Sequence, residues 1–120
     1  MAKILIAEDE TDIRELIKLT LTFNGYDVVS ARDGAEAVEI AQKEVFDLIL
    51  MDVYMPRMDG YKACARLKEI ETTREIPIIF LSAKGQEGEV QQGLDAGASE
   101  YIVKPFAPDE LAAKVHSFLS

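Results

Sequence analysis

Cysteine and histidine are scarce in this sequence, which contains one of each among its 120 residues. Cys64 has no partner within the chain, so an internal disulfide is excluded and nothing indicates an oxidising compartment. His116 stands far along the chain from the acidic residues discussed below, and no thiolate accompanies them, so a zinc site has little support. We therefore expect a cytoplasmic protein without a disulfide framework.

Basic residues and long apolar runs are also in short supply. Lys and Arg number 13 against 22 Asp and Glu, which gives a formal net charge of −9. Because phosphate backbones and anionic membranes are bound mainly through clustered basic residues, neither nucleic acid nor membrane is an expected direct partner. No apolar run approaches the roughly 18 residues of a membrane span, and no signal peptide is recognisable.

The composition is otherwise that of one globular domain, residues 1–120, with 48% hydrophobic and 29% charged residues. Short apolar runs recur along it and suit buried strands. These runs are Ile4–Ala7, Tyr26–Ser30, Leu48–Met51, Ile76–Leu81 and Tyr101–Val103. The longer stretches between them have the apolar spacing of amphipathic helices.

Residues typical of helix ends punctuate the pattern. Asn24–Gly25 ends the first helix, Asp33 is placed to cap the second, Gly97 ends the fourth, and Pro108 begins the fifth. Strand and helix therefore alternate five times. Such alternation predicts an α/β fold whose parallel sheet is covered by helices on both faces, but it does not define the strand order.

Polar residues follow four of the five apolar runs. They are Glu8–Asp9–Glu10, Asp52, Ser82 and Lys104–Pro105. Open parallel sheets bind ligands at the carboxyl ends of their strands, so these residues are expected at one edge. Three carboxylates gathered there would repel one another unless a cation or a raised pKa relieved the repulsion. Mg²⁺ prefers such oxygen ligands and commonly bridges carboxylates to a phosphate.

With the charge offset, one carboxylate can attack phosphorus and form an acyl phosphate. Asp52 suits this role because it ends a central apolar run and precedes the open loop Val53–Gly60. The metal, the Lys104 ammonium and the Ser82 hydroxyl would each bind one phosphoryl oxygen, as phosphoryl transfer requires. Taken singly, each residue has a plainer interpretation: Asp52 as a cap, Ser82 as a turn residue, and Lys104 as a structural partner of a carboxylate.

Four motifs in order resemble the receiver domain of bacterial two-component response regulators across essentially the whole chain. They are Glu8–Asp9, Asp52 with Met55–Gly60, Ser82–Ala83 and Lys104–Phe106. The resemblance implies a doubly wound, flavodoxin-like three-layer sandwich of five βα units, with strand order 2-1-3-4-5. It also implies a signalling protein that catalyses only its own phosphorylation and dephosphorylation.

The resemblance assigns roles at the site. Asp52 would accept the phosphoryl group from a sensor histidine kinase or a phosphotransfer protein. Asp9, Asp52 and the backbone carbonyl of Tyr54 would ligate Mg²⁺, with Mn²⁺ as an alternative ion, and Glu8 would assist through water. Bulky Tyr54 and Lys84 look like the variable positions that control the access of water to the acyl phosphate, with Tyr54 slowing its hydrolysis.

The resemblance also implies a switch. Lys104 and Ser82 would contact the phosphoryl group, Ser82 would move toward it, and Tyr101 would turn inward. These changes would remodel the face formed by the fourth helix, fifth strand and fifth helix, which would contact a downstream protein or output domain. The Lys104–Pro105 bond is expected to be cis, as in the family, although most X-Pro bonds are trans.

Three alternatives remain open at the level of sequence. A phosphatase of the haloacid dehalogenase type also forms an aspartyl phosphate with Mg²⁺, but its second acid would stand where this chain has Tyr54. A flavodoxin-like cofactor binder needs a hydroxyl- and glycine-rich phosphate loop, whereas residues 8–12 are mostly acidic. A receiver that binds partners without being phosphorylated is the third. The kinase, the downstream target and any longer parent chain are not identified by the sequence.

Overall fold

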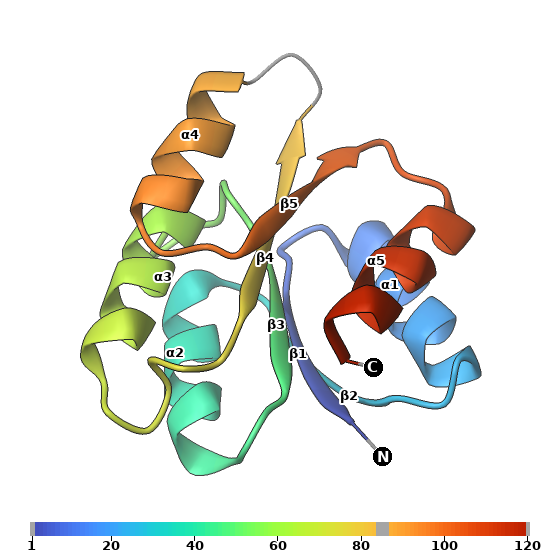
Figure 1. Ribbon diagram of the computed structural model, residues 1–120, viewed down its shortest axis with the longest axis horizontal. Coiled ribbons are helices and arrows are strands. Elements are labelled where there is room, and N and C mark those ends of the chain that lie inside the picture. Colours follow the sequence, from blue (N-terminus) through green and yellow to red (C-terminus); the bar gives the residue numbers. More distant parts are fainter. Residues whose placement is uncertain (1, 84–86, 120) are drawn as a thin grey trace.

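The computed structural model describes residues 2–83 and 87–119, in which five strands alternate with five helices (Figure 1). In chain order the elements are β1 (Lys3–Ala7), α1 (Thr11–Phe23), β2 (Asp27–Ala31), α2 (Gly34–Lys43), β3 (Leu48–Asp52), α3 (Gly60–Glu69), β4 (Ile78–Ala83), α4 (Glu87–Asp95), β5 (Glu100–Lys104) and α5 (Pro108–Leu119). Every predicted strand is present. None of the described helices has the length and apolarity needed to cross a bilayer.

The strands form one parallel sheet in the order β2-β1-β3-β4-β5, as the resemblance implied. The chain starts in β1, moves outward to β2, and then returns past β1 to build β3, β4 and β5. Strand order therefore reverses between β1 and β3, which is where open α/β sheets bind ligands. Ala7 pairs with Met51 in this register, so Glu8 and Asp52 come next to each other at the carboxyl edge.

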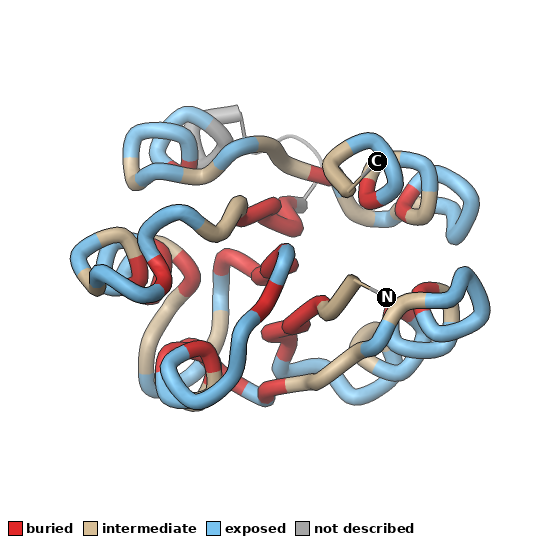
Figure 2. Tube along the Cα trace, turned by 60° about the horizontal axis from the view of Figure 1, so that its bottom comes forward, coloured by how far each residue is buried: buried red, intermediate tan, exposed pale blue. Residues whose placement is uncertain are grey.

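Helices cover both faces of the sheet, α1 and α5 on one and α2, α3 and α4 on the other (Figure 1). Successive residues of β1 alternate between the two layers: Ile4 and Ile6 belong to the core cluster under α1 and α5, and Leu5 and Ala7 to the opposite cluster. The sheet is buried from both sides (Figure 2). This burial explains why the central strands are continuously apolar instead of alternating with polar residues.

The predicted residues lie at the helix ends in the structure. The Asp33 side chain caps α2 by accepting a hydrogen bond from the Glu36 amide at 2.8 Å. Gly97, two residues past α4, has a left-handed φ of 111°, and Pro108 is the first residue of α5. The Lys104–Pro105 bond is cis, as expected.

Candidate functional site

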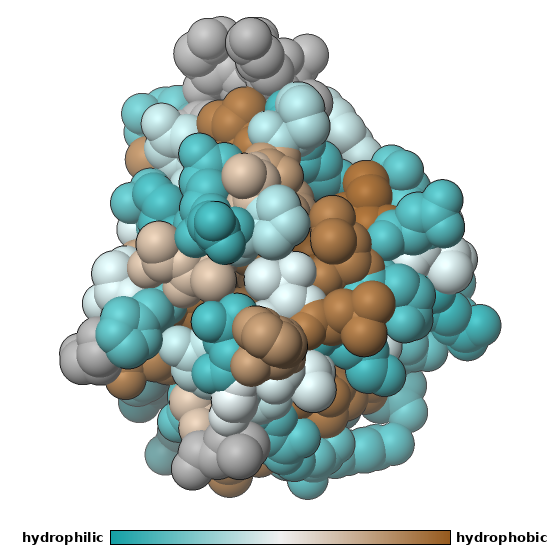
Figure 3. Space-filling view, turned by 90° about the vertical axis from the view of Figure 1, so that its right-hand side faces the viewer, coloured by the Kyte–Doolittle hydropathy of each residue, from teal (hydrophilic) through white to brown (hydrophobic). Residues whose placement is uncertain are grey.

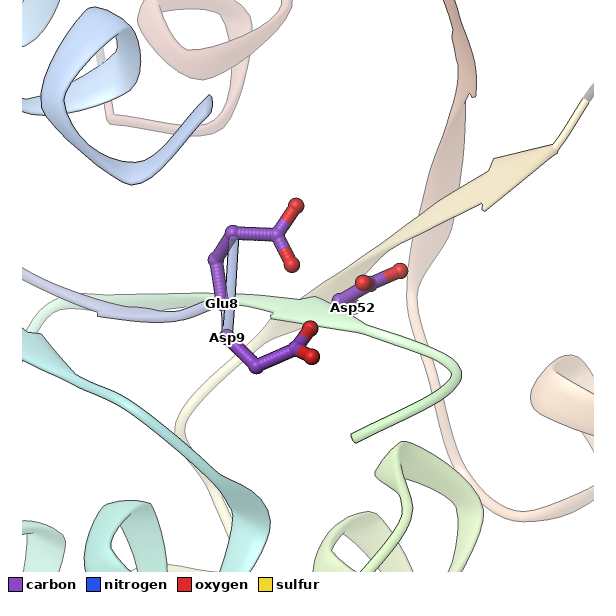
Figure 4. A group of neighbouring side chains, drawn as sticks. All are labelled: Glu8, Asp9 and Asp52. Carbon is purple, nitrogen blue, oxygen red and sulfur yellow. The ribbon is translucent and has the colours of Figure 1, made fainter. Parts of the chain in front are cut away.

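Three carboxyl groups meet at the carboxyl edge of the sheet (Figure 4). Glu8 and Asp9 directly follow β1, Asp52 ends β3, and one carboxylate oxygen from each lies within 4.8 Å of the other two. Glu8 is fully buried, Asp52 is 8% exposed, and Asp9 is exposed. The cluster is therefore closed on the Glu8 side and reaches solvent beside Asp9.

Lys104 places an ammonium group between two of these acids. Its Nζ lies 2.8 Å from Glu8 Oε1 and 3.1 Å from Asp52 Oδ2. Burial lowers the pKa of Lys104, but the hydrogen bond to Glu8 and the charge of Asp52 outweigh burial and raise the pKa above its usual value. Lys104 is therefore charged at neutral pH, and its ammonium pairs with two of the three carboxyl groups.

Glu8 is the most perturbed group of the cluster. Burial, followed by interaction with Asp52, raises the pKa of its carboxyl group to about 8, although Lys104 acts in the opposite direction. Its Oε2 atom is buried without a hydrogen-bond partner among the described residues. Among the described residues, the positive charge at the cluster is therefore smaller than the negative charge, and one buried carboxyl oxygen has no hydrogen-bond partner. A hard divalent cation such as Mg²⁺ fits this all-oxygen donor set.

The Asp52 carboxylate is held in a defined orientation. Its Oδ1 accepts a hydrogen bond from the Val53 amide at 2.9 Å, and its Oδ2 faces Lys104. Ser82 lies on the neighbouring strand, one residue beyond the Leu81 that pairs with Asp52, and is 1% exposed. The predicted nucleophile, ammonium and hydroxyl therefore belong to three adjacent strands, β3, β5 and β4, that end at the same edge.

The remaining predicted residues lie farther out. Tyr54 is 63% exposed in the loop after β3. Tyr101 in β5 is half-buried and packs against the core cluster under α2 and α3. Their proposed roles, in water access and switching, stay predictions. Lys84 lies outside the described residues.

The contacts of two arginines near the site were not predicted from the sequence, although Arg57 belongs to the Met55–Gly60 motif. Arg14 Nη1 donates to the Glu8 backbone carbonyl at 2.8 Å and thereby supports the loop that carries the first two acids. Arg57, in the loop after β3, forms an ion pair with Asp33, which lies just before α2. Both contacts join residues whose proximity depends on the folded loops, so no short motif could have revealed them.

A model of the family described as "Response regulator receiver domain" matches residues 4–116. This chain belongs to that family. Receiver domains accept phosphoryl groups, bind Mg²⁺ in an acidic pocket and partner with histidine kinases. The predicted family and fold are thereby confirmed, and the family is one of signalling proteins, which argues against the phosphatase alternative.

Individual relatives agree with this assignment. The receiver is 44% identical to a probable transcriptional regulator, ycf27, of Cyanophora paradoxa, over 98% of this chain and 48% of that protein. It resembles chemotaxis protein CheY4 of Vibrio cholerae with a TM-score of 0.93 and 36% identity, covering 98% of both chains. It also resembles the receiver domain of sensor histidine kinase PA1611 from Pseudomonas aeruginosa PAO1, which has a magnesium ion coordinated in its active site cleft (TM-score 0.91, 35% identity, 98% and 97% coverage). The chain spans about half the length of the curated relatives that it matches.

Proposed function

We propose that this receiver takes a phosphoryl group from a phosphohistidine onto Asp52 in a Mg²⁺-dependent reaction. The proposal rests mainly on one observation: an oriented Asp52 carboxylate stands among acids whose negative charge exceeds the positive charge of Lys104, the ammonium that pairs with them among residues 2–83 and 87–119. Such an excess of carboxylate next to a buried, unpaired oxygen suits a divalent cation.

Asp9, Asp52 and the backbone carbonyl of Tyr54 would hold the ion, Mg²⁺ or alternatively Mn²⁺, with Glu8 acting through water. A bound divalent ion supplies charge neutralisation for the carboxylates and for the phosphoryl oxygens. Asp52 would attack phosphorus through a carboxylate oxygen as the phosphorus–nitrogen bond breaks and the histidine of the donor leaves.

Lys104 and Ser82 would stabilise the transferred group. The Lys104 ammonium already lies 3.1 Å from Asp52, so it can bind a phosphoryl oxygen on that side chain without a large movement. The Ser82 hydroxyl would donate to a second oxygen. Movement of Ser82 and inward rotation of Tyr101 would then carry the signal to the face formed by α4, β5 and α5.

A hollow beside β5 supports the proposed path of that signal. A hollow of about 550 Å³ between β5 and α5 is lined by both Tyr101 and Lys104. It extends from a residue of the phosphoryl site to the surface of β5, where Val103 is 38% exposed. We propose that a downstream protein or output domain contacts the receiver on this face.

The phosphodonor would dock at a second hollow beside the site. An apolar hollow of about 330 Å³ is lined by Ile13 and Leu16 of α1 together with Lys104, Pro105 and Phe106. Figure 3 shows hydrophobic residues gathered on the side of the molecule formed by α1 and α5. Because Lys104 borders both this hollow and Asp52, a kinase or phosphotransfer protein seated here could bring its phosphohistidine to Asp52.

The test is incubation with a small phosphodonor, such as an acyl phosphate, followed by intact mass measurement. With Mg²⁺ the receiver should gain one phosphoryl group, in an adduct that is stable in acid and labile in base. With EDTA in place of Mg²⁺ the adduct should be absent. No adduct under either condition would refute phosphoryl acceptance, and equal adduct in both would refute the metal requirement.

Glu8 makes stability depend on pH when metal is absent. Its carboxyl pKa is about 8 in the folded receiver and near the ordinary value of 4.5 in the unfolded chain, so the folded state alone retains the proton between these values. The free energy of unfolding should therefore fall as pH rises from about 5 to 8. Glu8→Gln, which carries no titratable proton, should flatten this dependence.

At pH 8 in EDTA we expect Glu8→Gln to be more stable than the parent by on the order of 2 kcal/mol. Urea unfolding at several pH values measures the difference. Mg²⁺ should narrow the gap by stabilising the ionised parent. Parallel pH profiles for the two proteins would show that Glu8 is not the titrating group.

A further inference from the structure

Arg57 has an unusual backbone conformation in the loop that follows Asp52. Its φ of 67° is left-handed, and no other non-glycine residue of residues 2–83 and 87–119 has a positive φ. Side chains with a Cβ disfavour this region, and such residues persist where surrounding contacts hold them in place. The contacts of Arg57 therefore need an explanation.

The Arg57 guanidinium binds Asp33 at two points. Its Nε lies 3.0 Å from Asp33 Oδ2, and its Nη2 donates to Oδ1 at 3.2 Å. The same carboxylate accepts the capping hydrogen bond from the Glu36 amide, and the Asp33 side chain is only 11% exposed. Asp33 is thus already fixed by the start of α2, and Arg57 binds to a stationary partner.

A backbone contact holds the same loop beside this ion pair. The Gly34 amide donates to the Met58 carbonyl at 3.2 Å, and a Cβ atom on Gly34 would overlap that carbonyl oxygen. The base of the loop is closed by the Gly60 amide, which donates to the Val53 carbonyl at 2.7 Å. The loop is therefore anchored at its base and, through Arg57 and Met58, at the start of α2. Tyr54 lies between these anchors.

We propose that Arg57 is a positioning residue for the metal site, because its ion pair with Asp33 holds the loop that presents the Tyr54 backbone carbonyl to Mg²⁺. This inference rests on the proposed function. Arg57 acts through Asp33 and the loop backbone and touches neither metal nor phosphoryl group. A loop ordered in advance binds the ion without the entropy cost of becoming ordered at that moment.

Two substitutions break the pair while preserving the local structure. Arg57→Asn removes the guanidinium, and Asn tolerates a left-handed backbone. Asp33→Asn removes the negative charge, and Asn caps helices about as well as Asp. Each should weaken Mg²⁺ affinity by about three- to fivefold, the size expected for an ion pair with one exposed partner.

The measurement is a Mn²⁺ titration, followed by electron paramagnetic resonance of the free ion, with Mg²⁺ as competitor. Arg57→Asn removes a positive charge and Asp33→Asn removes a negative one, so a purely long-range electrostatic effect would change affinity in opposite directions. The ion-pair hypothesis instead predicts weakening in both. If the two residues act as a unit, the double variant should bind no more weakly than either single variant.

Arg32→Gln is the matched control. Arg32 is 75% exposed, lies beside the start of α2 and pairs with Glu36 at 3.5 Å, so this variant loses one positive charge without touching the loop. Its Mg²⁺ affinity should equal that of the parent. Thermal unfolding in EDTA, recorded for every variant, separates a loss of affinity from a loss of folded protein.

Unchanged affinity in Arg57→Asn, opposite shifts in the two single variants, or additive losses in the double variant would each overturn the inference. Asp9→Asn distinguishes this failure from failure of the metal site itself. If the parent binds the ion and Asp9→Asn does not, the proposed metal site is supported independently of the result for Arg57. If the parent binds no ion, or Asp9→Asn binds it equally well, the proposed metal site and this inference both fall.

Discussion

Asp52→Asn is expected to abolish the phosphorylated adduct formed with a small phosphodonor and Mg²⁺. An amide oxygen is a poor nucleophile compared with a carboxylate, and the variant also removes one negative charge from the proposed metal site. The fold should survive, because the Asn carbonyl oxygen can still accept the Val53 amide and repulsion from Glu8 is relieved. Intact mass after incubation, compared with the parent, measures the effect.

Asp27→Asn is the matched control for this substitution. Asp27 is exposed at the start of β2, at the end of the sheet away from the acid cluster. It should be phosphorylated as fully as the parent. A full adduct in Asp52→Asn would mean that another side chain is the acceptor, and peptide mapping of the adduct would identify it.

Gly60→Ala is expected to destabilise the receiver by about 3 kcal/mol, a magnitude typical of severe local clashes. A Cβ atom at this position would overlap the backbone carbonyl oxygen of Asp52 and come 3.0 Å from the Phe80 ring. Backbone cannot give way as a flexible side chain can, so the end of β3 must shift. Because that shift moves Asp52 itself, we expect phosphorylation to slow even where the variant is still folded.

Gly25→Ala separates the clash from the general cost of replacing a glycine. Gly25 has a φ of 91°, but nothing lies within 4 Å of a Cβ built there. Its cost should be about 1 kcal/mol, from backbone strain alone, and phosphorylation should be unaffected. Urea unfolding and adduct formation are measured on both variants. Equal effects at the two positions would refute the proposed contact with Asp52.

The strand boundaries show where a hydrophobic pattern stops being informative. The fourth apolar run was predicted to end at Leu81 and the fifth at Val103, yet β4 continues to Ala83 and β5 to Lys104. Ser82 and Lys104 are therefore strand residues, with Ser82 paired to Val103. Polar side chains ended the apolar runs, but strand pairing depends on backbone hydrogen bonds, which do not depend on side-chain polarity.

Lys104 illustrates a second limit. Its position after the fifth apolar run predicted a place at the edge with the acids, and the structure confirms that place. Its bond to Glu8, 96 residues away in the chain, was foreseeable only as one general possibility of pairing with a carboxylate. Which carboxylate Lys104 contacts depends on how far β5 extends toward the carboxyl edge compared with β1. The pairing register of the strands sets that difference.

The sequence by itself determined the alternation of strands and helices, the edge at which Glu8, Asp9, Asp52, Ser82 and Lys104 gather, and the family. Periodicity and capping are local, and parallel strands necessarily end at a common edge. Tertiary structure alone decided that Glu8 is buried with a raised pKa and that Arg57 is tied to Asp33. Desolvation and ion pairing depend on distances between segments remote in the chain, which only packing of the whole domain establishes.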